Sequence, residues 1–211
     1  QAAEYGLAAV AFHQGRPDEF RKEALAFLQR SPAAPAVPRI LYILAALAVE
    51  EKAWLDARRF TLRLVTGFGK EDVADDALFR LGSGALAAGQ WQLARESYEL
   101  LRGRYPGSPF DRDAQLGLAE ALLKSGTAAE ARTLIEALVP AIAGDARLPA
   151  ALLLLAQARE VAGEQGQALE AYDRLVREFP NADEMRPAQI GQGRLLQAAG
   201  RWEESRRVLE R

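Results

Sequence analysis

The sequence predicts an all-α solenoid of about six helix-turn-helix hairpins, and three observations carry this prediction. Glycine recurs every 37 residues along most of the chain. A small side chain, usually alanine, follows most of these positions by five residues, with Phe20 as the exception. Apolar residues recur at helical spacing on both sides of each glycine. A fixed period of about 20 to 50 residues is typical of repeat proteins whose units stack on their neighbours. The recurring glycines are Gly15, Gly89, Gly126, Gly163 and Gly200. The recurring alanines are Ala57, Ala94, Ala131 and Ala168.

Each unit is expected to contain two helices that share one core. In the third unit, Leu78 and Leu81 mark the apolar face of the first helix. Ala94, Tyr98 and Leu101 stand at i, i+4 and i+7 and mark the inward face of the second. We therefore expect one repeat domain over the whole chain, without a linker. Its units run over about 1–37, 38–74, 75–111, 112–148, 149–185 and 186–211.

The turn inside each hairpin is expected at the recurring glycine. Glycine ends a helix well because it adopts the left-handed backbone conformation without a Cβ clash. Lys52 stands at this place in the second unit, so we expect its turn to be slightly strained or differently built. A helix breaker such as Pro106 closes each hairpin. Ser108 and Pro109 then offer a cap and a first-turn proline to the next helix.

Tryptophan recurs two residues after the turn in three units. Trp54, Trp91 and Trp202 share this place in the repeat. We interpret them as core residues that pack between hairpins and not as a platform for stacking nucleic-acid bases.

Composition excludes several classes of function. The 211 residues carry a formal net charge of -2, which argues against a nucleic-acid partner. No apolar run is long enough to span a membrane. The chain has no cysteine and only one histidine, His13, so nothing indicates a catalytic nucleophile and its base. The acidic run from Glu71 to Asp76 is interpreted as a helix start and not as a metal site. We expect no enzyme activity, no cofactor and no metal.

The repeat resembles the tetratricopeptide repeat over the entire chain. The third and fifth units match its pattern best. The residues that depart from it are Phe20, Ala24, Lys52, Thr61 and Gln192. The resemblance implies a right-handed superhelix that binds proteins. The matching residues of the two units are Leu81, Gly82, Gly89, Trp91, Ala94, Tyr98 and Pro106, and Leu155, Ala156, Gly163, Ala168, Tyr172 and Pro180.

Two details of the repeat look like those of bacterial envelope proteins. The 37-residue spacing and the Tyr105-Pro106 and Phe179-Pro180 pairs are similar to repeats of outer-membrane assembly lipoproteins and Tol–Pal coordinator proteins. This resemblance favours a periplasmic or outer-membrane-associated protein over a cytoplasmic one. Because the chain begins at Gln1, we expect it to be part of a longer protein.

The resemblance also implies a concave groove lined by the first helix of each hairpin. Its residues are mostly apolar in the N-terminal and middle part and polar in the last two units, and the carboxylate clamp of the family is missing. An apolar groove suits a peptide or an amphipathic helix of a partner protein. The predicted groove residues are Phe12, Tyr42, Val49, Phe79, Leu86, Glu120, Leu123, Gln157 and Arg194.

These patterns predict a non-catalytic scaffold for protein–protein interaction. The alternative is a docking module of a larger enzyme or envelope-anchored protein whose other domains lie outside this chain. A neighbouring element could also cover the apolar part of this groove. Val208 and Leu209 form an apolar face near the end of the sequence, and a homodimer through exposed terminal helices is one further expectation.

Overall fold

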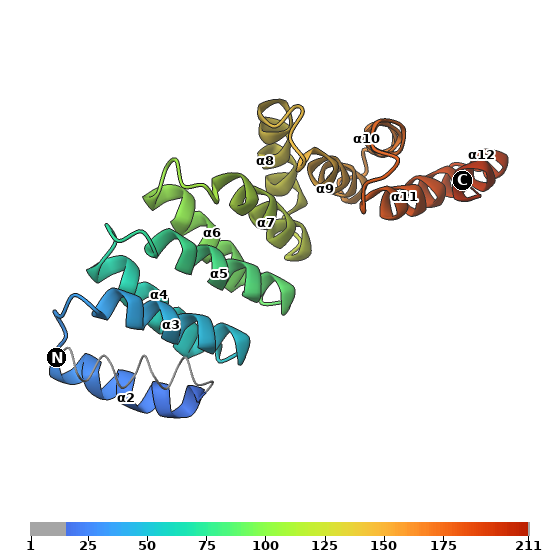
Figure 1. The fold of residues 1–211 in the computed structure, drawn as a ribbon. Helices are drawn as coiled ribbons and strands as arrows, with labels where there is room; N and C mark the ends of the chain where they lie inside the picture. Colours follow the sequence, from blue (N-terminus) through green and yellow to red (C-terminus); the bar gives the residue numbers. More distant parts are fainter. Residues whose placement is uncertain (1–15, 211) are drawn as a thin grey trace. The chain divides into compact units, whose positions relative to one another are not determined.

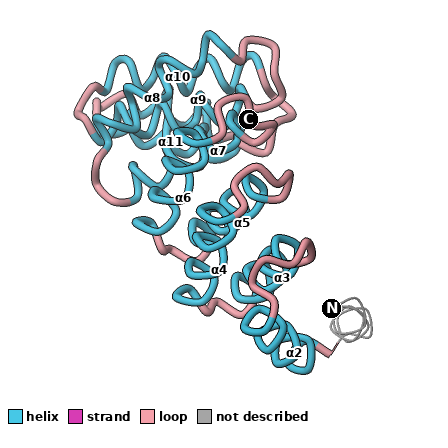
Figure 2. The backbone as a smooth tube through the Cα atoms, turned by 90° about the vertical axis from the view of Figure 1, so that its left-hand side faces the viewer, coloured by secondary structure: helices cyan, strands magenta, loops and turns pink. Residues whose placement is uncertain are grey.

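The computed structural model describes residues 16–210, and this part of the chain consists of helices joined by turns (Figures 1 and 2). Ten of these helices have 14 residues each, and the last has 8. The helices are α2 (Pro17–Arg30), α3 (Val37–Glu50), α4 (Trp54–Gly67), α5 (Ala74–Ala87), α6 (Trp91–Arg104), α7 (Asp111–Lys124), α8 (Ala128–Ala141), α9 (Leu148–Val161), α10 (Gln165–Glu178), α11 (Met185–Ala198) and α12 (Trp202–Leu209).

The chain forms two compact units, which we describe separately. Unit 1 covers residues 1–111 and unit 2 covers residues 112–211. Helices α2 to α6 belong to unit 1. Helices α7 to α12 belong to unit 2, except that α7 begins at Asp111, the last residue of unit 1.

The helices repeat with the predicted period. The first helices of successive hairpins begin at residues 37, 74, 111, 148 and 185, each 37 residues after the one before. The second helices begin at residues 54, 91, 128, 165 and 202, with the same spacing. The prediction of an all-α helical repeat is confirmed. The predicted starts of the units at 38, 75, 112, 149 and 186 each fall one residue after the start of a first helix.

The turn after α5 shows how each hairpin is closed. Gly89 has a φ of 75°, in the left-handed region. The N–H of Gln90 donates to the carbonyl oxygen of Ala85 at 2.8 Å, and the N–H of Gly89 donates to that of Leu86 at 3.1 Å. These two bonds form a Schellman motif, which satisfies carbonyl groups that the end of a helix would leave without partners.

Lys52 adopts the same turn without a glycine. Its φ is 58°, and it is the one residue other than glycine with a positive φ in the described part of the chain. The N–H of Ala53 donates to the carbonyl oxygen of Ala48 at 2.8 Å, and the N–H of Lys52 donates to that of Val49 at 3.0 Å. The turn is therefore built in the same way as the others and is strained, because a Cβ atom disfavours the left-handed conformation.

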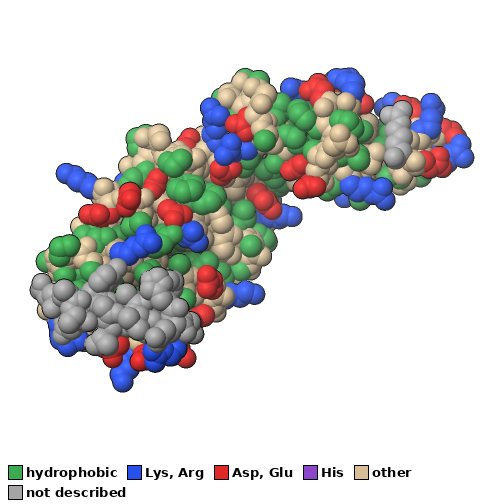
Figure 3. Space-filling view, viewed as in Figure 1, with side chains coloured by type: hydrophobic (Ala, Val, Ile, Leu, Met, Phe, Trp, Pro, Cys, Tyr) green, Lys and Arg blue, Asp and Glu red, His purple; other side chains and the backbone are tan. Residues whose placement is uncertain are grey.

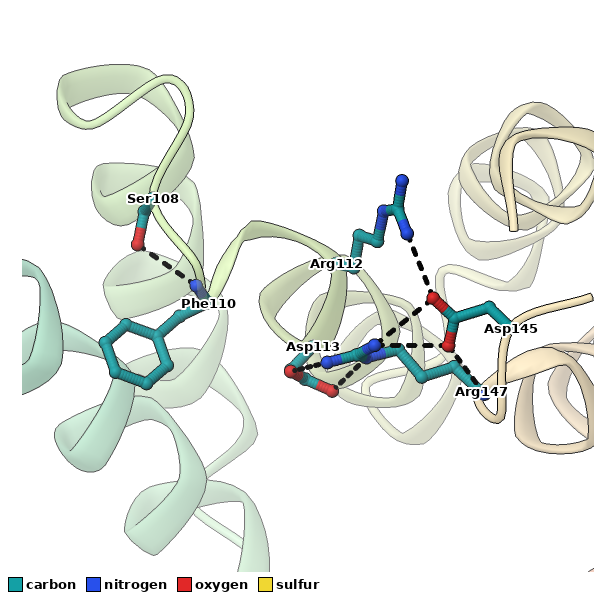
Figure 4. A network of polar contacts seen from close by, with 6 residues as sticks. All are labelled: Ser108, Phe110, Arg112, Asp113, Asp145 and Arg147. Atoms are coloured by element: carbon teal, nitrogen blue, oxygen red, sulfur yellow. Dashed lines mark hydrogen bonds and ion pairs between the residues drawn. The ribbon is translucent and has the colours of Figure 1, made fainter.

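The helix that follows Ser108 begins later than the sequence suggests. Pro109 and Phe110 form a turn, and α7 begins at Asp111, so the prediction of a first-turn Pro109 is wrong. The physical reason is a second turn, in which the N–H of Asp111 donates to the carbonyl oxygen of Ser108 at 3.0 Å. The hydroxyl of Ser108 accepts from the N–H of Phe110 at 3.2 Å, so it caps this turn instead of the helix (Figure 4).

Small residues allow close packing inside the hairpins. Ala57, Ala94, Ala131 and Ala168 are all buried, and Ala57 packs with Ala48 of its own hairpin and Leu81 of the next. In the third hairpin, a Cβ atom at Gly82 would lie 2.7 Å from the ring of Tyr98. The absence of a side chain at Gly82 thus makes room for a buried aromatic ring from the second helix.

The tryptophans do not lie in the core, and this prediction is wrong. Trp54 and Trp91 are half-buried, and Trp202 is 65% exposed. Each is the first residue of a second helix. The ring of Trp91 lies over its own turn, 3.4 Å from where a Cβ of Gly89 would be, whereas the ring of Trp54 reaches the next hairpin, 3.8 Å from where a Cβ of Gly84 would be. Leu209 of α12 is also exposed, and the homodimer through terminal helices stays a prediction.

Candidate protein-binding clefts

Unit 1 contains an apolar cleft between α3 and α5, and Phe110 contributes to its lining. Its volume is about 360 Å³. Four polar residues join the apolar ones, and we call this site the α3–α5 cleft. Its lining residues are Ala46, Val49, Phe79, Gly84 and Phe110, with Glu50, Asp76, Arg80 and Ser83.

Aromatic stacking and a close helix contact hold the apolar part of this cleft in place. The rings of Phe79 and Phe110 are stacked, with centroids 4.9 Å apart and an interplanar angle of 13°. A Cβ atom at Gly84 would lie 2.3 Å from Val49, so α3 and α5 approach closely only because position 84 has no side chain. The apolar wall is therefore formed before any partner binds.

Two of the charged residues in the α3–α5 cleft neutralise each other. Asp76 accepts a hydrogen bond from the hydroxyl of Tyr42 at 2.5 Å and one from Nε of Arg80 at 3.3 Å. The guanidinium groups of Arg39 and Arg80 lie 5.4 and 5.6 Å from the centre of the Tyr42 ring, within the range of a cation–π contact. Burial and the neighbouring Asp76 raise the pKa of the Tyr42 phenol, which keeps it a hydrogen-bond donor.

Glu50 differs from the other polar residues of the cleft. Ser83 is hydrogen-bonded to the hydroxyl of Tyr98 at 3.2 Å. Glu50 is exposed, and within residues 16–210 its carboxylate has neither a hydrogen bond nor an ion pair. Of the charged groups that line this cleft, only the carboxylate of Glu50 lacks a partner among the residues described.

Unit 2 contains a second cleft, which is more polar. Its volume is about 560 Å³, and we call it the α7–α9 cleft. Glu160 accepts a hydrogen bond from Tyr172 at 3.0 Å and one from Arg194 at 2.6 Å. Burial raises the pKa of Tyr172, so its hydroxyl stays protonated and continues to donate. The lining residues are Leu123, Lys124, Gln157, Glu160, Val161 and Arg194.

Five of the predicted groove residues line the two clefts. Val49 and Phe79 line the α3–α5 cleft, whereas Leu123, Gln157 and Arg194 line the α7–α9 cleft. Tyr42 lies beside the first cleft through its bond to Asp76. Leu86 and Glu120 are half-buried and line neither cleft. Phe12, Gly15 and His13 lie outside the described residues.

Sequence reasoning missed several residues of the clefts. Phe110 comes from the turn before α7, where the repeat pattern assigns no groove position. Glu50 and Val161 stand at the thirteenth place of their units, which the resemblance counts among the groove-lining places, but neither is among the predicted groove residues. The acidic run contributes Asp76, which accepts hydrogen bonds within the α3–α5 cleft.

An ion-pair network joins α7 to the start of α9 in unit 2, outside the clefts. The guanidinium of Arg147 contacts Asp113 at 2.6 and 2.7 Å and Asp145 at 3.1 Å, and Arg112 also donates to Asp145 at 2.9 Å (Figure 4). The backbone N–H of Arg147 donates to Asp145 at 3.0 Å. This bond, followed by those from the two guanidinium groups, lowers the pKa of the Asp145 carboxyl.

We expect this network to make unit 2 less stable in acid. Because the folded pKa of Asp145 lies below its unfolded value, the carboxylate stabilises the fold above about pH 4 and the contribution disappears as the pH falls through the folded pKa. Asp145→Asn should therefore narrow the difference in melting temperature between pH 7 and pH 3, measured by circular dichroism. The control is Asp183→Asn, an exposed carboxylate without an ion pair in the described part of unit 2. An equal narrowing in both variants would contradict the role of the network.

Among the described residues, the surface in view in Figure 3 carries no large patch of one charge. Acidic and basic side chains are interspersed there with hydrophobic ones. Among residues 16–210, no group of three or more His, Asp or Glu side chains is arranged to hold a metal ion. In the same range, every helix is too short or too polar to cross a membrane.

The repeated hairpins define an all-α helical-repeat solenoid. Models of the tetratricopeptide repeat match residues 79–146 and 150–182. The chain therefore carries tetratricopeptide repeats, as the sequence pattern predicts. A search of curated protein sequences finds no match.

Solved structures with the same fold cover most of the chain. A tetratricopeptide repeat protein from Parabacteroides merdae has a TM-score of 0.70 and 14% identity, covering 100% of this chain and 78% of the other. A putative kinesin light chain repeat protein from Podosopora anserina has a TM-score of 0.65 and 21% identity, covering 84% of this chain and 94% of the other. PilW, a type IV pilus biogenesis factor, has a TM-score of 0.60 and 12% identity, covering 98% of this chain and 89% of the other. At these identities the similarity shows the fold.

The fold indicates the general class of function. Tetratricopeptide repeats are modules that bind other proteins, so this chain has the architecture of a protein–protein interaction scaffold. None of the matched families is catalytic.

Proposed function

We propose that this chain is a non-catalytic interaction scaffold whose α3–α5 cleft holds apolar side chains of a peptide or helix from a partner protein. The observation that carries the proposal is that Val49 and Phe79 line one cleft of about 360 Å³. These residues belong to successive hairpins and occupy two of the repeat positions from which a groove is expected. Phe110 adds a stacked aromatic ring to the same wall.

The lining of the cleft supports an apolar ligand with a defined orientation. Binding pockets of proteins are mostly apolar, with a small number of polar groups that fix the orientation of the ligand. The α3–α5 cleft has this composition, since five apolar or small residues are joined by four polar ones. A helix of a partner would place side chains at i, i+3, i+4 and i+7 into such a groove. The more polar α7–α9 cleft offers a second contact region in unit 2.

A variant that fills the cleft tests this proposal. Ala46 is half-buried and lines the cleft, so the ring of Ala46→Phe would occupy the space that a partner side chain needs. The probe is a fluorescein-labelled helical peptide with leucines on one face and glutamines elsewhere, and its binding is followed by fluorescence anisotropy. We expect Ala46→Phe to weaken binding at least about tenfold, a change of about 1.4 kcal/mol.

The control places the same side chain on an exposed position of the other unit. Ala129 is exposed on α8, and Ala129→Phe should bind the peptide as the wild type does. The proposal fails when the wild type does not bind the peptide, or when Ala46→Phe binds it as tightly as the control.

The cellular setting is a second part of the proposal. The similarity of fold to PilW, a type IV pilus biogenesis factor, supports the bacterial envelope setting that the Tyr-Pro and Phe-Pro pairs favour. Fractionation of cells that express the full-length gene with an epitope tag tests this part. Recovery with the cytosol would contradict it, and the binding role of the cleft would stand.

A further inference from the structure

Charge at the α3–α5 cleft distinguishes among the apolar partners that could enter it. We propose that this cleft selects a partner segment in which a lysine or arginine stands next to the apolar side chain that binds. The inference rests on the proposed function, because it specifies the partner of the same cleft.

The first step is the balance of charge among the lining residues. Asp76 and Arg80 are bonded to each other at 3.3 Å, and the second contact of Asp76 is the hydroxyl of Tyr42. Their opposite charges cancel. The carboxylate of Glu50 has no partner among the described residues. Among the described residues, the cleft therefore carries one uncompensated negative charge.

The second step is the position of Glu50 on its helix. Glu50 follows Ala46 by four residues, so the two lie on the same side of α3, and both line the cleft. It is also the last residue of α3, and the C-terminal end of a helix carries a partial negative charge. The carboxylate and the helix end together favour a cation beside an apolar side chain in the cleft.

The third step concerns a partner with an acidic residue at the same place. Its carboxylate would face Glu50, which repels it. Arg80 offers weak compensation, because its guanidinium is already bonded to Asp76 and lies over the ring of Tyr42. Lys52 is two residues beyond Glu50 but does not line the cleft. The arrangement therefore disfavours acidic partners.

The experiment compares three labelled peptides that differ in a single residue. Each has leucines on one helical face and glutamines elsewhere, and one glutamine beside the central leucine is kept, or replaced by arginine or by glutamate. Dissociation constants are measured by fluorescence anisotropy at low salt. Because an exposed ion pair contributes modestly, we expect the arginine peptide to bind about threefold to tenfold more tightly than the glutamate peptide. The difference should shrink when salt is added.

Two matched variants identify the residue responsible. Glu50→Gln should bind the arginine and glutamate peptides about equally. Glu51→Gln makes the same change one residue along the chain, at a carboxylate that pairs with Arg21 and does not line the cleft. It should keep the preference of the wild type. Circular dichroism of both variants checks that the fold is retained.

The outcomes separate this inference from the proposed function. Equal binding of all three peptides by the wild type would overturn the charge preference alone and would leave the apolar cleft as a binding site. A preference that survives in Glu50→Gln would also overturn it. When none of the peptides binds the wild type, the proposed function and the charge preference both fail.

Discussion

The Tyr172→Ala variant is expected to lose about 3–5 kcal/mol of unfolding free energy, the usual cost of removing a large buried aromatic side chain. Tyr172 is only 1% exposed and belongs to the main core of unit 2. Its ring fills the space beside Gly191, where a Cβ atom would lie 2.4 Å from the ring. Alanine would leave a cavity that the two helices cannot close without shifting. Urea unfolding followed by circular dichroism measures the loss.

Tyr172→Phe separates the packing of the ring from the hydrogen bond of its hydroxyl. The hydroxyl donates to Glu160 at 3.0 Å, and its removal should cost about 1 kcal/mol. The phenylalanine variant should therefore be much more stable than the alanine variant. An equal loss of unfolding free energy in both variants would contradict the prediction that packing of the ring against Gly191 is the main stabilising contribution of Tyr172.

Ala94→Trp is expected to destabilise unit 1 by about 1–3 kcal/mol or more, because the contact has no room for a larger side chain. Ala94 is fully buried in α6. Its place in the repeat is occupied by alanine in four units, and all four alanines are buried. A tryptophan there would push the two helices of the hairpin apart. The melting temperature should fall clearly.

Gln92→Trp is the matched control for this prediction. Gln92 is exposed on the same helix, two residues away, and its side-chain amide donates to Glu96 at 3.1 Å. The loss of one exposed hydrogen bond is small, so its melting temperature should stay close to that of the wild type. Equal melting temperatures of Ala94→Trp and Gln92→Trp would contradict the packing role of this position.

The period of the repeat could be predicted because it depends on short-range chemistry. Helix periodicity, a left-handed residue at each turn and a buried small residue are properties of neighbouring positions, and they recur at 37-residue spacing. The placement of individual side chains depends on which helix covers them. Trp202 is exposed although it shares its repeat position with two half-buried tryptophans.

The candidate clefts were only partly predictable for the same reason. Val49 and Phe79 follow from their repeat positions, but Phe110 reaches the cleft from a turn. The proposed charge preference depends on the hydrogen bonds that Asp76 accepts from Tyr42 and Arg80. No pattern of the sequence shows these two bonds. Gln192 departs from the repeat pattern. The structure buries it to 9% exposure, and its Oε1 has no hydrogen-bond partner in the described part of the chain.

The left-handed Lys52 has a consequence for how such repeats diverge. The hairpin of α3 and α4 keeps its helix lengths and its two turn hydrogen bonds although it lacks the glycine of the other turns. The two backbone hydrogen bonds therefore form at this turn without a glycine, and the hairpin keeps its shape although its turn residue differs. Matches to the family begin only at residue 79, whereas the same architecture extends back through this hairpin. A hairpin of this kind can therefore lose a signature residue of the family while it keeps the fold.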